Sequence, residues 1–221
     1  MNKKKKEQET WEQLLSSQMI FQEKFPECIL VGGTAAALHA GHRFSMDADH
    51  VHVNLKRDFE KILKKVESEA GWHTNRLEPP VLILGHFKGV RTGIRQLIRT
   101  KPLETTVIHG LRVPTQEEIL RIKAYLIVKR NATRDFIDFI ALFDNLGTSQ
   151  SVKALSTLDA CYPQKSEASM LQQLTVQLAE PKPWDLTETD LKNYKKLKAE
   201  YADWKEITKR ARAAAQSISK A

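Results

Sequence analysis

Cysteine is scarce in this 221-residue chain, with Cys28 and Cys161 as its two thiols. Neither lies in a Cys-x-x-Cys pair or at a spacing to histidine that is typical of zinc ligands, which argues against a disulfide framework and a zinc site. Long apolar runs are also absent, since no stretch approaches the ~18 consecutive apolar residues of a membrane span. The basic start, residues 3–6, is not followed by the apolar segment of a secretory signal. These absences predict a cytoplasmic protein without a membrane partner.

What the chain has instead is positive charge, with 35 Lys and Arg against 27 Asp and Glu and a formal net charge of +8. The segment 86–134 holds eleven basic and three acidic residues, so its surplus equals that of the whole chain. A solvated basic face is one interpretation of such a segment. A surface that binds polyphosphate or RNA is the other. The basic run at the start predicts a disordered tail over residues 1–8.

Hydrophobic periodicity predicts an α/β (α+β) fold with two lobes. Residues 9–113 are expected to form a mixed sheet with flanking helices, and residues 114–221 a helical lobe that completes the site. Short strands separated by glycine and proline are expected in the first lobe. The expected helices cover 9–25, 34–40, 57–68, 115–130, 134–146, 151–162, 166–179 and 187–217, and the expected strands cover 28–31, 47–53, 81–85, 92–99, 104–110 and 111–114.

One stretch near the start of the first lobe carries clear chemical content. A predicted strand ends in Gly32-Gly33, and a helix starts at Thr34. Glycine lets backbone amides approach a phosphate closely, and a helix start adds a positive dipole end. Asp47 and Asp49 then follow on a strand, where alternate side chains share a face. Two carboxylates placed together repel unless a cation lies between them, so this pair suits a divalent ion that completes its shell with phosphate oxygens.

Together, the glycine turn and the Asp-x-Asp resemble the signature of the nucleotidyltransferase superfamily that includes DNA polymerase beta. The sequence over 32–35 (Gly-Gly-Thr-Ala) and 42–49 (His-Arg-Phe-Ser-Met-Asp-Ala-Asp) is similar to the AbiEii/AbiGii toxin family of nucleotidyltransferases. A second block, Lys-Ala at 123–124 followed by Arg-Asn-Ala-Thr-Arg-Asp-Phe-Ile-Asp at 130–138, is similar to the downstream Lys-x-x-Ala and Arg-Asp-x-x-Asp of that family. The resemblance covers about residues 28–145.

The resemblance implies transfer of a nucleoside monophosphate from an NTP with release of pyrophosphate. It implies that Asp47 and Asp49 hold Mg2+ or Mn2+, which neutralises the triphosphate and activates the attacking hydroxyl. For Arg43 it leaves two roles open, a bond to a phosphate or a structural bond to the loop before Asp47. The nucleotide-binding residues that it implies are Gly32, Gly33, Thr34, Arg43, Ser45 and Lys123, and the catalytic ones are Asp47, Asp49, Lys123 and Asp138, with Asp138 and Asp135 orienting Lys123 or assisting at the site.

Three further features qualify this hypothesis. Many members of the superfamily carry a third carboxylate on a later strand, and Glu104 is the only acidic residue between positions 79 and 116. Glu104 is therefore the candidate base or third metal ligand if its strand is the one concerned, and a solvated strand residue otherwise. His50 and His52 lack a third ligand and are interpreted as packing residues. On the second predicted helix of the helical lobe, Asp135 and Asp138 are at i,i+3 and Arg134 can reach Asp138 at i,i+4, which predicts one polar stripe of the three residues. A salt bridge on the helix surface is the alternative interpretation.

The favoured hypothesis is a metal-dependent nucleotidyltransferase of toxin type, with an NTP as substrate, RNA or tRNA as acceptor and a cognate antitoxin as partner. A nucleotidyltransferase that modifies small molecules or proteins is the second hypothesis. The third is a non-catalytic protein that uses the same fold to bind a nucleotide or a partner. The retention of Asp47, Asp49 and Lys123 together favours catalysis.

Overall fold

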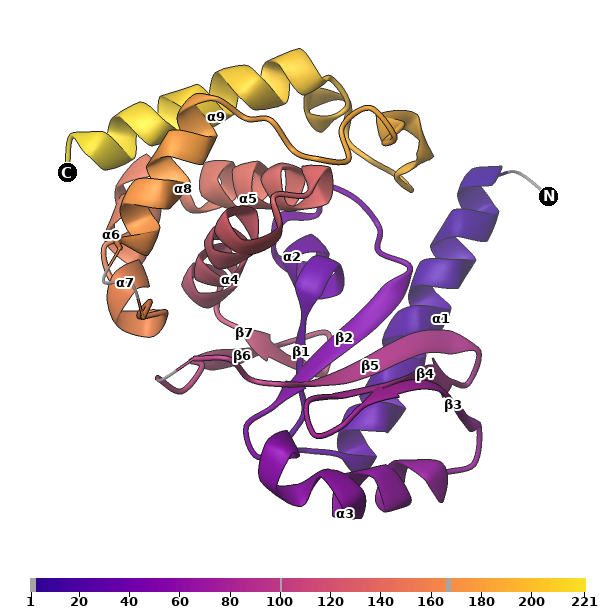
Figure 1. Cartoon of the computed structure of the whole chain (residues 1–221). Helices are drawn as coiled ribbons and strands as arrows, with labels where there is room; N and C mark the ends of the chain where they lie inside the picture. Colours follow the sequence, from indigo (N-terminus) through magenta and orange to yellow (C-terminus); the bar gives the residue numbers. More distant parts are fainter. Residues whose placement is uncertain (1–2, 100, 166–167) are drawn as a thin grey trace. The chain divides into compact units, whose positions relative to one another are not determined.

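The computed structural model describes residues 3–99, 101–165 and 168–221 of the chain (Figure 1). They form two compact units, each described here by itself. Unit 1 comprises the described residues up to Ala35, together with Phe44–Ile98 and Thr105–Pro114. Unit 2 comprises Ala36–Arg43, Arg99–Glu104 and the described residues from Thr115 to Ala221. The main elements in chain order are α1 (Lys3–Lys24), β1 (Ile29–Val31), α2 (Gly32–Ala40), β2 (Asp47–His52), α3 (Leu55–Glu67), β3 (Trp72–Glu78), β4 (Leu82–Phe87), β5 (Val90–Gln96), β6 (Thr105–Ile108), β7 (Leu111–Pro114), α4 (Gln116–Arg130), α5 (Thr133–Leu146), α6 (Thr148–Leu155), α7 (Leu158–Cys161), α8 (Met170–Ala179) and α9 (Trp204–Ser219).

Unit 1 contains a five-stranded mixed sheet with the strand order β1-β2-β5-β4-β3. Strand β2 runs antiparallel to β1 and parallel to β5, so it is hydrogen-bonded along both edges. The register places Asp49 beside Val31 on one side and beside Gly93 on the other. Because a shift by one residue would turn every side chain of β2 to the opposite face, this double pairing fixes which way its side chains point. The mixed α/β class predicted from the sequence is confirmed.

The two faces of β2 differ in exposure. Ala48, His50 and His52 are buried, whereas Asp47 and Asp49 are partly exposed. The buried face packs against α1 and α3, which lie on the same side of the sheet (Figure 1). The core of unit 1 comprises Phe21, Phe25, Cys28, Leu55, Phe59, Ile62, Val66, Trp72, Ile83, Phe87 and Ile94. The buried His50 ring packs against Phe21 of this core, with the ring centroids 4.9 Å apart, which agrees with the prediction that it is a packing residue.

A separate two-stranded sheet of β6 and β7 also belongs to unit 1. The buried side chain of Gln22 on α1 links it to β1. Its amide nitrogen donates to the carbonyl oxygens of Arg112 and Cys28 at 2.9 and 3.2 Å, and its carbonyl oxygen accepts from the Arg112 amide at 2.7 Å. A single side chain thus satisfies backbone groups of β7 and of the residue before β1.

Unit 2 is helical, and its centre is α4 and α5 (Figure 1). Helix α4 begins as predicted, because the Thr115 hydroxyl accepts a hydrogen bond from the Glu118 amide at 3.4 Å. It ends at Asn131, whose φ of 46° places it in the left-handed region that stops a helix. Helix α4 packs against α5, α6 and α8, and α9 packs against α5 and α8.

Residues 181–203, between α8 and α9, form a strap that is tied to unit 2 by polar contacts. The Asp185 carboxylate accepts from the amide and the hydroxyl of Thr133 at 2.7 and 2.8 Å and so caps the start of α5. The Lys198 amide donates to the His42 carbonyl at 2.9 Å. The Tyr194 ring lies 5.6 Å from the guanidinium carbon of Arg43. The strap therefore holds the segment that carries His42 and Arg43.

Several predicted elements differ from the observed ones. Helix α1 begins at Lys3, so the described residues of the predicted disordered tail are helical, and Met1 and Asn2 lie outside the described residues. Strand β3 is not predicted, because its residues are mostly exposed and polar and show no apolar alternation. The helix predicted over 187–217 is wrong before Trp204, where short 3-10 turns replace it. The start of the helix predicted over 166–179 falls on residues outside the described part. No described helix is both long and apolar enough to cross a membrane.

The burial of His50 predicts an acid-sensitive fold. Burial lowers the pKa of His50 to about 4, below the value of ~6.5 for an exposed histidine. The unfolded chain therefore takes up a proton that the folded chain refuses, and stability is lost as the pH falls below ~6.5. We expect His50 to account for about 2 kcal/mol of the loss in unfolding free energy between pH 7.5 and pH 5. Urea unfolding at both pH values checks this, with His50→Leu expected to lose less stability over the same range than the unmodified chain.

Candidate functional site

Asp47 and Asp49 of β2 share the partly exposed face of the sheet, as the sequence predicts. Residues two apart on a strand lie about 6–7 Å apart along it, so the two carboxylates are neighbours without being forced into contact. The Asp49 side chain is 37% exposed. Both carboxylates are thus reachable from the same side of unit 1.

Two glycines keep space open for the Asp49 carboxylate. Gly32 has a φ of +72°, and a Cβ there would lie 3.4 Å from Asp49 Oδ2. A Cβ on Gly93 of β5 would lie 3.1 Å from Asp49 Oδ1 and 2.7 Å from the side chain of Leu84. Gly32 is also the first residue of α2, so the Asp49 carboxylate lies at the positive end of that helix. The predicted glycine turn is therefore built around Asp49.

Thr34 and Ser45 hold the start of β2. Thr34 is fully buried, and its hydroxyl donates to the Asp47 carbonyl at 2.6 Å. The Ser45 hydroxyl donates to the same carbonyl at 3.2 Å. Both hydroxyls are thus engaged in fixing the main chain of Asp47. The roles in phosphate binding that the resemblance implies for them would require these bonds to be given up, whereas Gly33, the second residue of α2, is partly exposed.

Strand β5 supplies two residues that the sequence analysis missed as site residues. Arg91 lies beside Asp47 and Arg95 beside Val51, so both arginines are on the same face as the carboxylates. The Nε atom of Arg95 is 3.3 Å from Asp49 Oδ1. The sequence holds a signal for this arrangement in the alternation Arg-Thr-Gly-Ile-Arg. That signal points to Asp49 only once β5 is known to be the partner of β2.

Glu104 lies outside the five-stranded sheet. Its side chain is exposed, and it precedes β6, which pairs with β7. The strands that flank β2 in the sheet are β1 and β5, and neither carries an acidic residue. The strand β5 places Arg91, Gly93 and Arg95 beside β2, and a role of Glu104 as base or third metal ligand stays a prediction.

The two carboxylates of β2 fit a divalent metal ion such as Mg2+, which needs few protein ligands. Within the described ranges, no group of three or more His, Cys, Asp or Glu side chains could hold a metal ion. Mg2+ is usually held by one or two carboxylates, with waters and substrate phosphates as its other ligands. Asp47 and Asp49, with the space above Asp49 kept open by Gly32 and Gly93, meet that requirement. They fit an ion that arrives with a phosphate substrate rather than one enclosed by protein ligands.

The residues of the second sequence block lie within unit 2 and converge on Asp138 of α5. Arg43 binds the Asp138 carboxylate through both sides of its fork, Nε to Oδ1 at 2.7 Å and Nη2 to Oδ2 at 3.0 Å. His42 Nε2 lies 2.7 Å from Oδ1, and Lys123 Nζ lies 2.7 Å from Oδ2. Of the two roles left open for Arg43, the structure shows a structural bond, and Asp138 is a partner in it.

Lys123 is held between two carboxylates. Besides Asp138, its ammonium contacts Asp135 Oδ1 at 3.1 Å, and Asp135 also binds the Arg130 guanidinium. The Lys123 side chain is 1% exposed. The contacts implied for Asp138 and Asp135, which orient Lys123, are therefore present, while a contact of Lys123 with a triphosphate stays a prediction.

The charges of this cluster determine its protonation. Burial raises the pKa of Asp138, but the nearby Arg43 and Lys123 charges outweigh burial and hold the pKa well below its usual range. Burial likewise opposes the Lys123 and Arg130 charges at Asp135, whose pKa is lowered. Burial lowers the pKa of His42, although the hydrogen bond that His42 makes to the Asp138 carboxylate acts in the opposite direction. Both carboxylates are therefore ionised and His42 is neutral at pH 7.

The three residues of the predicted polar stripe do not share one face of α5. Asp135 and Asp138 are fully buried, whereas Arg134 is exposed. Asp138 takes its partners from Arg43, His42 and Lys123 instead. The i,i+4 rule fails here because α5 is buried on almost all sides. Its carboxylates therefore face the protein interior and find partners on other segments.

The basic surplus of segment 86–134 is only partly a surface property. Arg99 and Arg121 pair with Glu118. Lys123 and Arg130 pair with Asp135, the first residue after the counted segment. The remaining exposed basic side chains are divided between the two units. Those in unit 1 include Lys88, Arg91 and Arg95, and those in unit 2 include Lys101, Lys129 and Arg134.

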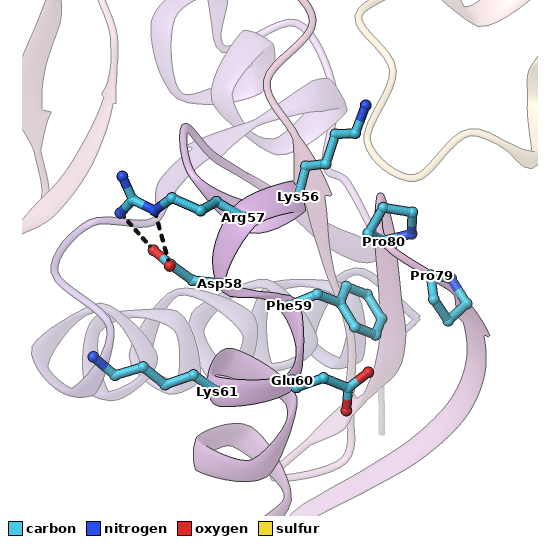
Figure 2. Close-up of a pocket in the computed structure, with 8 residues that line it drawn as sticks. All are labelled: Lys56, Arg57, Asp58, Phe59, Glu60, Lys61, Pro79 and Pro80. Atoms are coloured by element: carbon cyan, nitrogen blue, oxygen red, sulfur yellow. Dashed lines mark hydrogen bonds and ion pairs between the residues drawn. The ribbon is translucent and has the colours of Figure 1, made fainter.

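A hollow of about 520 Å³ lies in unit 1 between the start of α3 and the β3–β4 turn (Figure 2). Its lining combines three basic side chains with two acidic ones, and Arg57 is paired with the adjacent Asp58. None of the predicted site residues lines it. The lining residues are Lys56, Arg57, Asp58, Phe59, Glu60, Lys61, Pro79 and Pro80.

Comparison with solved structures shows the fold. A candidate nucleotidyltransferase from Helicobacter pylori superposes with a TM-score of 0.57 at 20% identity, over 94% of this chain and 93% of that one. The protein JHP933 from Helicobacter pylori gives a TM-score of 0.56 at 19% identity, over 95% of this chain and 90% of the other. MenT4, a nucleotidyltransferase toxin from Mycobacterium tuberculosis, gives 0.50 at 12% identity, over 88% and 76%. The chain therefore has a nucleotidyltransferase fold.

Comparison of sequences finds similarity over only part of the chain. No family model matches the chain, so the resemblance to the AbiEii/AbiGii toxins is not confirmed. The heme uptake protein MmpL11 from Mycobacterium tuberculosis is 36% identical over 95 residues, which is 40% of this chain and 10% of that protein. A mycolic acid-containing lipids exporter, MmpL11 from Mycolicibacterium smegmatis, is 34% identical over 119 residues. The chain spans about a tenth of the length of these curated relatives.

The buried cluster in unit 2 predicts a large stability effect at Asp138. Asp138→Asn removes the anion shared by Arg43 and Lys123, and breaking a buried ion pair in this way costs about 3–5 kcal/mol. We expect that loss in the free energy of unfolding measured by urea titration. The matched control on the same helix is Asp144→Asn, which breaks a partly exposed pair with Arg210 and should cost less than about 1 kcal/mol. Equal losses for the two variants would contradict the account.

Proposed function

We propose that the chain is a metal-dependent nucleotidyltransferase that transfers a nucleoside monophosphate from an NTP to an acceptor, with RNA as the favoured acceptor. The observation that carries the proposal is the pair Asp47 and Asp49 on one reachable face of β2, with Gly32 and Gly93 leaving room above Asp49, in a chain of nucleotidyltransferase fold. Fold alone does not specify chemistry, so the weight rests on this site.

The chain's own residues account for much of what such a transfer needs. Asp47 and Asp49 would hold Mg2+ or Mn2+, and the bound ion would supply charge neutralisation at the triphosphate and a more acidic acceptor hydroxyl. The start of α2 directs backbone amides and a positive dipole end toward the same place, which favours phosphate. Thr34 and Ser45 keep Asp47 in position through its carbonyl. Because phosphoryl transfer is mainly a matter of positioning and charge, these elements are the ones expected to matter.

RNA is favoured as the acceptor because of exposed positive charge beside the carboxylates. Lys88, Arg91 and Arg95 lie on the β4–β5 hairpin, and both arginines are on the face that carries Asp47 and Asp49. A polyanion that lies along β5 would meet these charges, whereas a small acceptor has no need of them. A protein or small-molecule acceptor remains the second candidate. Both NTPs and RNA are cytoplasmic, which is where we place the activity.

A toxin role belongs to the same proposal. MenT4, which shares the fold, is described as a nucleotidyltransferase toxin. A toxin of this kind would need a cognate antitoxin as partner. Induced expression in a bacterial host is expected to stop growth, and the Asp49→Asn variant, expressed to the same level, is expected to permit it. Growth arrest by both the unmodified chain and the variant would show that toxicity does not depend on Asp49.

The transfer itself is tested with each of the four labelled NTPs, Mg2+ and total RNA. We expect label to enter RNA with one or more of the NTPs, together with release of pyrophosphate. Asp47→Asn and Asp49→Asn should each lower the rate by about 100-fold or more, because each removes a ligand of an ion that contributes several kcal/mol to the transition state.

The matched control for the transfer assay is Asp58→Asn. It removes the same charge from unit 1, at an exposed position paired with the adjacent Arg57. Its rate is expected to stay within twofold of the unmodified chain. Absence of transfer with every NTP and acceptor, while Mg2+-dependent NTP binding is retained by calorimetry, would favour the non-catalytic nucleotide-binding alternative.

The choice between RNA and a small acceptor is tested by salt. Binding of RNA through the exposed arginines predicts an affinity that falls steeply between 50 and 200 mM KCl, as counterions are released. Arg91→Gln should reduce that slope by about one unit. A salt-independent rate with a small or protein acceptor would contradict the RNA assignment and leave nucleotidyl transfer intact.

A further inference from the structure

The surroundings of Asp49 show how the site balances its charge. On the face of the sheet that carries Asp47 and Asp49, β5 places Arg91 and Arg95 on either side of Gly93. The two carboxylates of β2 therefore face two arginines of the adjacent strand. The repulsion between the carboxylates, which on sequence grounds calls for a cation, is relieved by protein cations.

Arg95 is the arginine that contacts a carboxylate. Its Nε lies 3.3 Å from Asp49 Oδ1, the same oxygen that a Cβ at Gly93 would approach to 3.1 Å. Gly93 thus lets the carboxylate lean over β5 toward Arg95. Arg91 is exposed and has no ion-pair partner among the described residues, although it lies on the same strand and face. The two arginines therefore carry the same charge, but only Arg95 is seen to contact Asp49.

The contact is one that can open. The Arg95 and Asp49 side chains are 47% and 37% exposed, and ion pairs of that exposure are weak. Arginine matches carboxylate and phosphate equally well through its planar fork. A guanidinium beside Asp49 therefore lies where it can exchange a carboxylate for a phosphate without moving far along the strand.

We propose that Arg95 takes the place of a cation at Asp49 until a divalent metal ion and a triphosphate enter together, and that the released guanidinium then binds a phosphate oxygen. This inference rests on the proposed function and adds a coupling between its two ligands. Arg95 competes with the metal ion for Asp49 when no phosphate is present, and it holds the phosphate once the ion has taken its place. Metal binding is thereby made dependent on the substrate. Arg95 acts as a positioning residue that leaves Asp49 when a phosphate is there to bind it.

The first measurement is binding of Mn2+ alone to the full chain, followed by electron paramagnetic resonance in 150 mM KCl. Loss of binding in Asp49→Asn identifies the site. We expect Arg95→Gln to bind Mn2+ about three- to fivefold more tightly than the unmodified chain, the size expected for removing one half-exposed ion pair that competes for the ligand. Arg91→Gln removes an equal charge without the contact and should change the affinity by less than about twofold, since exposed charges are screened at this salt.

The second measurement is calorimetric binding of inorganic tripolyphosphate in the presence of excess Mg2+. The inference predicts the opposite sign here, with Arg95→Gln binding at least about tenfold more weakly because a charge-assisted bond to phosphate is lost. Arg95→Lys keeps the charge but not the planar guanidinium. Its affinity for tripolyphosphate should lie between those of the unmodified chain and Arg95→Gln.

The results that overturn the inference are specific. An Arg95→Gln variant that binds Mn2+ no more tightly than the unmodified chain removes the competition. An equal gain in Arg91→Gln reduces the effect to net charge. An unchanged affinity for tripolyphosphate removes the phosphate role. None of these readouts needs nucleotidyl transfer, so a failure of the proposed reaction and a failure of this coupling are seen separately.

Discussion

Two carboxylates on one face of a strand repel each other, and the structure of unit 1 around β2 follows from that constraint. Double pairing of β2 holds Asp47 and Asp49 on the same side, and Gly32 and Gly93 keep side chains away from Asp49. The start of α2 and the arginines of β5 supply positive charge. The helix start and the arginines favour an anion beside the carboxylates, and a triphosphate with a metal ion is the ligand that we propose for this place.

Unit 2 solves a different electrostatic problem, since its ionic groups are buried. Asp138 accepts bonds from Arg43, His42 and Lys123, and Asp135 shares Lys123. Charges that are buried to this extent persist because every one of them is paired. Within unit 2 the cluster fixes the segment that carries His42 and Arg43. The residues implied for catalysis in this block are thus held rigidly by one another.

The sequence predicted the mixed α/β fold, the glycine turn and the shared face of the Asp pair, because each depends on local spacing: two glycines, a period of two, a helix start. It failed where partners come from distant strands. Only the pairing of β5 with β2 shows that Arg91 and Arg95 share the face of the Asp pair and that Arg95 contacts Asp49. It also failed at Asp138, because burial of α5 on all sides turns a helical stripe inward. Charge counted along the chain included lysine and arginine side chains that are paired inside.

The most direct test of the account is the location of Mn2+ in crystals grown with a non-hydrolysable NTP, by anomalous diffraction at the manganese edge. The account predicts a manganese peak within ligand distance of Asp47 and Asp49 and of the triphosphate oxygens, with the Arg95 guanidinium turned from Asp49 to phosphate. A triphosphate bound elsewhere in the chain, or manganese peaks away from both aspartates, would contradict it.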